Sequence, residues 1–257
     1  MKLGIFSDLH ADLAMLEAAL GRMRALGCEQ IVCAGDIVDG DVFPDECIAR
    51  LAADGIPTIR GNHDRWALEH AGELRRSGRR HEDLRADGPS VVYEPEAGGT
   101  LGSGFELSKE SLRWLGTLPT SLTIALGEGL IAVHHARPGL WGGDMVGIDP
   151  GTTSPSQLET MLDNAGADVL LVGHTHERFA MRLPSGRLVA NPGALWSGGV
   201  TYERRGALYT PGAPSHGTFG VLDVKTRRFR VYRAGDGELV LDSGGVTGSR
   251  SGTGDEP

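Results

Sequence analysis

The sequence predicts an α/β protein in which helices cover a layered β-sheet. Up to residue 178, short apolar runs typical of buried strands alternate with segments of helical periodicity. Beyond residue 178 the pattern changes to two hairpins, at 179–191 and 218–234, which predict antiparallel strands and a second sheet. The apolar runs of the first part lie at 2–6, 30–34, 56–60, 130–134 and 168–173.

Three helices between these runs have recognisable start signals. Asp12 is the predicted N-cap of a helix whose leucines recur at a helical period from residue 13 to 26. Pro44 precedes a second predicted helix over 45–54. Ser154 and Gln157 form a capping box, with proline at the first helical position between them.

Residues 65 to about 128 interrupt the alternation. Two helix-like segments, 65–76 and 108–118, flank a glycine-rich stretch at 95–105. An insertion of that length is usually functional or mobile, so we expect a lid or specificity cap within a single domain over 1–242. The tail, 243–257, has few apolar residues and is predicted to be disordered.

Composition excludes several classes of protein. The 257 residues are 40% hydrophobic, which is ordinary for a globular protein, and no apolar run approaches the roughly 18 residues of a membrane span. The net charge of −9 argues against general attraction to nucleic acid or anionic membrane. The N-terminus has no signal-peptide pattern, and the three cysteines form no CxxC pair. We therefore expect a cytoplasmic protein with reduced cysteines.

Side chains that can bind metals follow every one of the five apolar runs. Open α/β sheets bind ligands at the carboxyl ends of their strands, so these side chains are expected to meet. Six of the nine histidines lie in these positions, a clustering that argues for one metal centre. The residues are Asp8, His10, Asp36, Asn62, His63, Asp64, His134, His135, His174 and His176.

The spacing of these residues supports a shared site. Residues two apart in extended chain point the same way, so Asp8 with His10, and His174 with His176, can each face one cavity. Imidazole and carboxylate together suit zinc, manganese or iron, and the carboxylate of Asp36 can bridge two cations. Two adjacent cations polarise a shared water and clamp the attacking and leaving oxygens of a phosphoryl group.

Five motifs, in this order, resemble those of the calcineurin-like metallophosphoesterase superfamily, in particular its small prokaryotic phosphodiesterases and phosphatases. The resemblance spans residues 3 to about 195 and includes a later NPGAL segment at 191–195. It implies a four-layer αββα sandwich of two mixed sheets flanked by helices, with two metals at the strand ends. The motifs are SDLH at 7–10, GDIVDG at 35–40, GNHD at 61–64, IAVHH at 131–135 and GHTH at 173–176.

The resemblance also implies a role for each motif residue. His63 is the expected general acid, and Asp39 matches the position of an acidic partner that keeps it protonated. The expected cofactors are two divalent ions, manganese first, with iron, zinc, nickel or cobalt as alternatives. One metal would be bound by Asp8, His10, Asp36 and His176, and the other by Asp36, Asn62, His134 and His174.

Two departures from the family pattern are visible. Gly40 stands where relatives with the GDxVDRG motif have a phosphate-binding arginine, so another arginine near a motif must serve, or none does. His135 stands where relatives usually have glycine, so either His134 or His135 can be the ligand; alignment of the apolar strand favours His134, and His135 would touch substrate or pack. The candidate arginines are Arg60, Arg65, Arg137 and Arg178.

Asp64 has two readings from the sequence. It is either a group that orients a metal ligand from behind or a capping aspartate after a turn. The sequence does not distinguish between these two roles.

The leading functional hypothesis is a phosphoesterase that hydrolyses a phosphomonoester or phosphodiester. A metal-bridging hydroxide would attack phosphorus in line while His63 protonates the leaving oxygen. The alternatives are a protein phosphatase of the same superfamily and a non-catalytic scaffold that binds other proteins. The expected partner is a small phosphorylated substrate, nucleotides included, with no nucleic acid or membrane partner; the sequence gives no oligomeric state.

Overall fold

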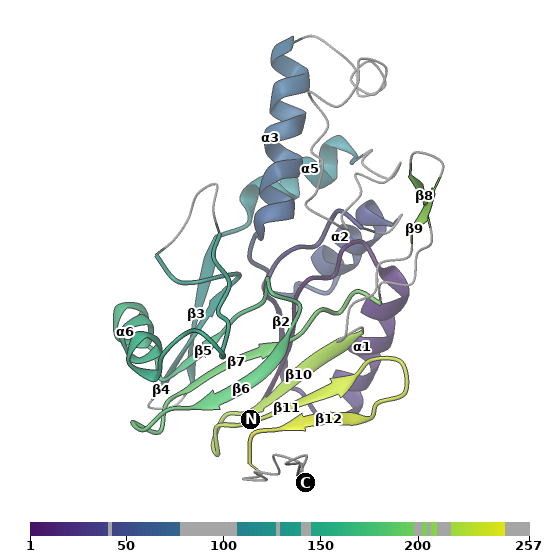
Figure 1. Ribbon diagram of the computed structural model, residues 1–257. Helices are drawn as coiled ribbons and strands as arrows, with labels where there is room; N and C mark the ends of the chain where they lie inside the picture. The colour runs from purple at the N-terminus through teal and green to yellow at the C-terminus, as the bar shows by residue number, and fades with distance from the viewer. Residues whose placement is uncertain are drawn as a thin grey trace, which may run out of the picture.

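The computed structural model describes residues 1–40, 43–77, 107–126, 129–139, 145–197, 202–204, 207–209 and 217–244. Two five-stranded sheets lie in the middle of the molecule, and helices cover their outer faces (Figure 1). The predicted four-layer αββα arrangement of two mixed sheets is therefore confirmed.

The first sheet combines the N-terminal and C-terminal parts of the chain. Its strand order is β12-β11-β10-β1-β2, with β1 and β2 parallel and the other neighbours antiparallel. The predicted hairpin at 218–234 is present as β10 and β11. The strands are β1 (Lys2–Phe6), β2 (Gln30–Cys33), β10 (Thr218–Asp223), β11 (Arg228–Arg233) and β12 (Leu239–Asp242).

The second sheet is built from the middle of the chain. Its order is β3-β4-β5-β7-β6, with β4, β5 and β7 parallel and an antiparallel strand at each edge. The hairpin predicted at 179–191 forms β6 and β7. The strands are β3 (Ser121–Leu126), β4 (Gly129–His134), β5 (Val169–Leu171), β6 (Arg178–Arg182) and β7 (Leu188–Pro192); a separate hairpin pairs β8 (Tyr202–Arg204) with β9 (Ala207–Tyr209).

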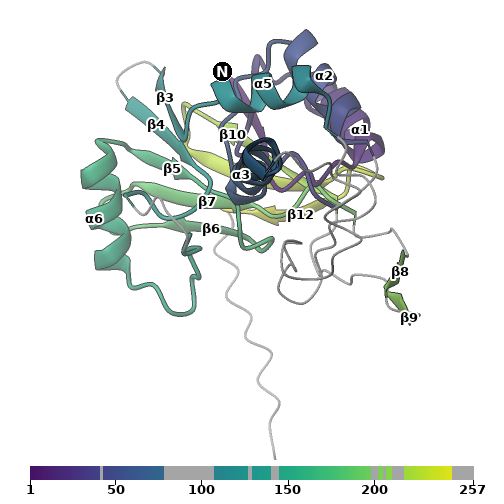
Figure 2. The ribbon, with the colours of Figure 1, turned by 90° about the horizontal axis from the view of Figure 1, so that it is seen from above.

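The helices begin where the sequence signals them. Asp12 caps α1 by accepting a hydrogen bond from the Met15 amide at 3.0 Å, and both halves of the predicted capping box at Ser154 are formed. Figure 2 shows α1 and α2 on one side of the sheets and α6 on the other. None of the described helices is long and apolar enough to cross a bilayer. The helices are α1 (Leu13–Ala25), α2 (Pro44–Ala53), α3 (Asn62–Ser77), α5 (Lys109–Thr117) and α6 (Pro155–Ala165).

Three apolar clusters fill the spaces between the four layers. Phe6 of β1 packs with Leu20 of α1 on the outer face of the first sheet. Its neighbour Ile5 faces the opposite way, into a cluster between the two sheets that also contains Phe229. Leu162 of α6 packs in a third cluster against the outer face of the second sheet. Adjacent strand residues therefore serve different layers, as the pleat of a strand requires.

The run at 56–60 is not a strand, contrary to prediction. It contributes one isolated parallel bridge, between Thr58 and Cys33. Pro57 lacks an amide donor, so only its carbonyl, which accepts from the Cys33 amide at 3.0 Å, contributes to pairing. The segment instead turns within a few residues into α3, which begins at Asn62.

The predicted insertion at 65–128 divides into parts that the structure describes differently. Its first part continues α3, which rises above the sheets in Figure 1, and its last part is α5 and the edge strand β3. Residues 78–106, the centre of the predicted cap, lie outside the described residues, as do 245–257 of the predicted tail. The lid and the disordered tail stay predictions.

Replacing Phe229 by alanine is expected to lower the free energy of unfolding by about 3–5 kcal/mol, because the ring is fully buried between the sheets. Leu239→Ala is the matched control, since that side chain is 46% exposed and should change stability by less than about 0.5 kcal/mol. Urea denaturation of both variants measures the difference. Similar losses for the two would contradict the inter-sheet position of Phe229.

Candidate metal centre

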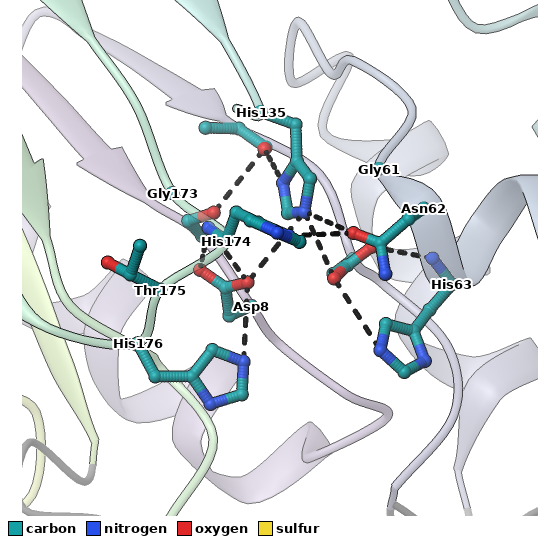
Figure 3. A network of polar contacts seen from close by, with 12 residues as sticks. Asp8, Gly61, Asn62, His63, His135, Gly173, His174, Thr175 and His176 are labelled. Carbon is teal, nitrogen blue, oxygen red and sulfur yellow. Dashed lines mark hydrogen bonds and ion pairs between the residues drawn. The ribbon is translucent and has the colours of Figure 1, made fainter. Parts of the chain in front are cut away.

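Loops from both sheets and the first turn of α3 bring the predicted polar residues to one place (Figure 3). The loop after β1 hydrogen-bonds to the loop after β2 through the Leu9 and His10 amides, which donate to the Asp36 carbonyl at 2.8 and 3.0 Å. The loop after β5 joins them because the His174 amide donates to both oxygens of Asp8, at 3.1 and 3.2 Å. The assembled residues are Asp8, His10, Asp36, Asp39, Asn62, His63, His135, His174 and His176.

Two glycines permit this close approach of loops. A β-carbon on Gly61 would collide with the carboxylate of Asp36. A β-carbon on Gly173 would collide with the Ser7 hydroxyl and lie 2.9 Å from Asp8 Oδ2. Because both carboxylates occupy space that a side chain would need, these positions of GNHD and GHTH require glycine.

The backbone of the cluster is strained. Eight described residues other than glycine have a positive φ, and six of them belong to the cluster. Left-handed conformations are costly for such residues and persist where surrounding structure enforces them, often at functional sites. The six residues, with their φ values, are Asp8 (54°), His10 (49°), Asp36 (54°), Asp39 (70°), His174 (72°) and His176 (60°).

The donor atoms of the cluster are arranged to hold cations. Three sets of acidic and histidine side chains have ligand atoms that all lie within 4.8 Å of one another. Asp36 and His10 each belong to two of the sets, so the sets form a continuous group. Nitrogen and carboxylate donors at this spacing suit zinc, manganese or iron. The sets are Asp8 with His10 and His176, His10 with Asp36 and His63, and Asp36 with His135 and His174.

Backbone carbonyls orient three of the imidazoles. The Nδ1 of His10 bonds the Asp39 carbonyl at 2.5 Å, and the Nδ1 of His135 bonds the Ala34 carbonyl at 2.8 Å. His174 is held the other way round, since its Nε2 bonds the Met145 carbonyl at 3.1 Å. Each ring therefore directs its other nitrogen into the cluster, an arrangement that fixes the tautomer of a metal-binding histidine.

His135, and not His134, joins the cluster, which corrects the expectation from the sequence. The Nε2 of His135 lies 3.0 Å from Asp36 Oδ2 and 3.0 Å from Asn62 Oδ1. His134 is the last residue of β4, where it pairs with Ser121. The strand ends there, and the chain then turns His135 inward to a fully buried position, so the side chain after the strand, not the last one in it, reaches the site.

Asn62 lies between the two histidines of this half of the cluster. Its Oδ1 is 2.9 Å from His174 Nδ1 and 3.0 Å from His135 Nε2. The amide oxygen is thus directed to the same point as the two imidazole nitrogens, as expected for a neutral oxygen ligand.

Asp64 holds the loops from behind the cluster, and its hydrogen bond with Gly61, the residue before α3, also fits the capping role that the sequence left open. Its buried carboxylate accepts hydrogen bonds from the amides of Asp36 at 3.0 Å, Ile37 at 2.9 Å, Val38 at 3.3 Å and Gly61 at 2.9 Å. Burial and the charge of Asp36 raise the pKa of Asp64 to about 6, and the amides of Gly61 and Ile37 oppose that rise. This single side chain ties the loop after β2 to the start of α3.

His63 and Asp39 form a close pair at the edge of the cluster. His63 Nδ1 lies 2.6 Å from Asp39 Oδ2, which leaves Nε2 directed elsewhere, 3.9 Å from Asp36 Oδ2. Burial by itself lowers the pKa of His63, but the charge of Asp36 and the hydrogen bond and charge of Asp39 raise it to about 9. The two carboxylates therefore favour the protonated form of His63 in the metal-free protein.

Opposite charges balance within the buried part of the cluster. The pKa of Asp8 is lowered to about 2, because the charges and hydrogen bond of His176 and the charge of His135 outweigh burial. The charge of Asp36 likewise outweighs burial at His135 and raises its pKa to about 10. Two buried carboxylates are thus kept ionised by positive charge close by, the condition under which a cation can replace protons.

Two of the candidate arginines, Arg137 and Arg65, have guanidinium contacts within the protein. Arg137 uses its guanidinium within the protein, donating to the Gly147 carbonyl at 3.0 Å and the Thr153 hydroxyl at 3.1 Å. Arg65 lies 3.6 Å from Glu69 one helical turn later. Arg60 donates its amide to Pro119. Arg178 begins β6, two residues after His176, and stays a predicted phosphate contact.

Two residue types near the cluster received no role from the sequence. The Asn191 side chain donates to the Gly173 carbonyl at 2.8 Å and so holds the GHTH loop; the NPGAL motif that contains it was the available signal. Trp66 and Trp196 pack edge-on against His63 and His10, with ring centroids 4.8 and 5.5 Å apart. Trp66 lies two residues after GNHD and Trp196 directly follows NPGAL, and these positions were the available signal.

The fold and the site together define a layered α/β protein with a buried aspartate and histidine centre, and comparison with known proteins agrees. The family model of the calcineurin-like phosphoesterase superfamily domain matches residues 1–227. The chain belongs to this superfamily. Membership of a phosphoesterase superfamily supports a hydrolase.

Relatives of known sequence or structure are distant but span nearly the whole chain. An uncharacterised protein of Methanocaldococcus jannaschii is 23% identical over 241 residues, covering 90% of this chain and 86% of its own. A hypothetical protein of Pyrococcus horikoshii has a TM-score of 0.63 at 20% identity, covering 90% of this chain and 87% of its own. A metallophosphoesterase from Sphaerobacter thermophilus has a TM-score of 0.57 at 22% identity, with 94% and 89% covered. At this identity the structures establish the shared fold.

The Asp39→Asn substitution is expected to lower the pKa of His63 in the metal-free protein from about 9 toward its ordinary 6.5, because the partner charge is removed. Since the pKa is raised in the folded state, the proton on His63 stabilises the fold fully below about pH 6.5, and this stabilisation is lost as the pH rises through about 9. NMR titration of the histidine side chains measures the pKa directly. Asp163→Asn, at a 67% exposed side chain, is the control, and an unchanged His63 pKa in Asp39→Asn would refute the pairing.

Proposed function

We propose that the protein is a phosphoesterase that works with two divalent cations. The donor atoms support two sites that share Asp36: its carboxylate belongs both to a set with His10 and His63 and to a set with His135 and His174. The first cation would be held by Asp8, His10, Asp36 and His176, and the second by Asp36, Asn62, His135 and His174. This is the expected ligand assignment with His135 in place of His134.

Manganese is the proposed metal, with iron, zinc, nickel and cobalt as alternatives that the same donors accept. Bound cations would supply the positive charge that offsets the negative charge of a phosphoryl group and would activate water near neutral pH. The protein contributes oriented donors and the removal of bulk water from the buried half of the cluster.

The His63–Asp39 pair is the observation that carries the proposal of catalysis. The Nδ1 of His63 is hydrogen-bonded to Asp39, so Nε2 is the nitrogen that can contact a substrate. In the metal-free protein the charge of Asp36 and the hydrogen bond and charge of Asp39 raise the pKa of His63, and Asp39 would continue to favour the protonated ring that a general acid requires. Hydrolysis of the ester needs one water and one proton at the leaving oxygen, and His63 Nε2 would donate that proton. Asp39 would hold the ring and favour its charged form.

The proposed substrate is a small phosphomonoester or phosphodiester, with nucleotides among the candidates. The protein phosphatase alternative rests on the GDIVDG motif at 35–40, and the scaffold alternative rests on the loss of chemistry in some relatives of the superfamily. The charged His63–Asp39 pair beside an intact donor set favours an enzyme over a scaffold, because a binding surface needs neither.

Metal-stripped protein resupplied with Mn²⁺ is expected to hydrolyse a chromogenic phosphomonoester or phosphodiester, and His63→Ala is expected to lower kcat by about 10²-fold or more through loss of the general acid. His134→Ala is the matched control, because this histidine lies on β4 outside the donor sets and should leave kcat within about twofold. Steady-state kinetics on both substrates measure the effect and rank the two ester classes.

Two results would count against the proposal. Full activity of His63→Ala would contradict the role of His63 as general acid. An equal loss of kcat in His134→Ala would show that the effect of the substitutions is structural. An absence of turnover in fully metallated wild type on both esters would favour the scaffold alternative, which a pull-down would then test.

A further inference from the structure

A short segment before α6 covers His174 on the side away from the cluster. The Met145 carbonyl lies 3.1 Å from His174 Nε2. Two residues later, Gly147 lies against the same loop: a β-carbon there would be 3.2 Å from His174 Cδ2 and would collide with the methyl of Thr175. The segment from Met145 to Thr153 is therefore in direct contact with a proposed metal ligand and with the residue that follows it.

Arg137 fixes this segment at three points. Its backbone amide donates to the Val146 carbonyl at 3.0 Å, and its Nε donates to the Gly147 carbonyl at 3.0 Å. Its Nη2 donates to the Thr153 hydroxyl at 3.1 Å, at the far end of the segment. The arginine also follows His135 by two residues, so it connects the loop that carries one proposed ligand to the segment that contacts another.

Two oxygens on opposite sides of His174 compete for the hydrogen of its neutral imidazole. Both nitrogens face oxygens, since Nδ1 lies 2.9 Å from Asn62 Oδ1 and Nε2 lies 3.1 Å from the Met145 carbonyl. A neutral imidazole has one N–H and can donate to only one of them. Donation to Met145 leaves the Nδ1 lone pair free to bind a cation beside Asn62; donation to Asn62 blocks it.

We propose that Arg137 is a positioning residue for His174: by holding the Met145–Thr153 segment, it keeps the Met145 carbonyl on Nε2 and so leaves Nδ1 available as a metal ligand. The inference rests on the proposed function for its importance, but the tautomer itself is a property of the metal-free protein. It gives Arg137 a use different from the phosphate contact expected from the sequence.

Arginine suits this position better than lysine would. The guanidinium donates in two directions at once, to a carbonyl through Nε and to a hydroxyl through Nη2. A lysine ammonium has three N–H donors, but all are on one nitrogen at the end of a flexible stem, so it does not reproduce the separated Nε and Nη2 donors of the planar guanidinium. Arg137→Lys is therefore expected to fall between wild type and Arg137→Ala, and this graded rescue separates positioning from mere side-chain volume.

The first experiment records the nitrogen chemical shifts of the histidine side chains in metal-free protein at about pH 8, above the ordinary histidine pKa. Wild type is expected to show His174 mainly as the Nε2–H tautomer. Arg137→Ala is expected to lower the ratio of Nε2–H to Nδ1–H by about 2- to 10-fold, the size of one lost hydrogen bond. Arg182→Ala is the matched control, since that arginine also donates to two backbone carbonyls, of Gly186 and Arg227, on the exposed side of β6.

The second experiment titrates metal-stripped protein with Mn²⁺ by calorimetry. Arg137→Ala is expected to weaken one of two binding events by about 10- to 100-fold, the usual effect of losing a group that orients a metal ligand, and Arg182→Ala should weaken neither. Gly147→Ala gives an independent variant that displaces the segment and keeps Arg137; it should reproduce both changes even if Arg137→Ala does not fold.

An unchanged tautomer ratio in Arg137→Ala and Gly147→Ala would overturn the inference, as would an equal change in Arg182→Ala. Failure of the proposed function looks different. If wild type binds no Mn²⁺, the metal proposal falls, whereas the tautomer measured without metal still decides whether Arg137 positions His174.

Discussion

The candidate metal centre depends most on the hydrogen bonds that the carboxylate of Asp64 accepts. A fully buried acid accepts four backbone amides, from Asp36, Ile37, Val38 and Gly61, and so fixes two loops relative to each other. Asp36, the residue shared between donor sets, lies on one loop, and the first turn of α3 with His63 follows the other. These buried hydrogen bonds stabilise the loop and so offset the energetic cost of the left-handed backbone conformation that Asp36 adopts there. Removing the carboxylate would deprive four buried amides of this acceptor and so would destabilise both loops.

The same logic of oriented support extends through the rest of the site. Backbone carbonyls fix the imidazoles of His10, His135 and His174, and the Asn191 side chain holds the loop that carries the last. The backbone contacts could not be predicted, because a carbonyl belongs to every residue, whereas the NPGAL motif was an available signal for the Asn191 side chain. The placement of these side chains after apolar runs therefore predicted which of them converge. It did not predict the backbone contacts that orient them. Asp64 is the exception, since its position in GNHD allowed an orienting role to be predicted.

Two expectations from the sequence differ from the structure because the sequence does not show where a strand ends. A period of two residues indicates which strand side chains share a face, but it does not indicate where the strand stops. His134 lies within the ladder and His135 just beyond it, so the pattern favoured the wrong one of two adjacent histidines. The strand predicted at 56–60 is the second case. The composition of this run is that of a strand, but Pro57 and the early start of α3 limit it to one bridge. The layers themselves were predictable, because Ile5 and Phe6 belong to different apolar clusters in the way that alternation requires.

Anomalous diffraction from crystals soaked in Mn²⁺ tests the central claim most directly, because it locates each ion without relying on activity. We predict two peaks separated by the carboxylate of Asp36, one beside His10 and His176 and the other beside His135 and His174. A second peak bounded by His134 would contradict the ligand assignment. Strong peaks elsewhere, with none at Asp36, would contradict the proposal that this buried cluster is a metal centre.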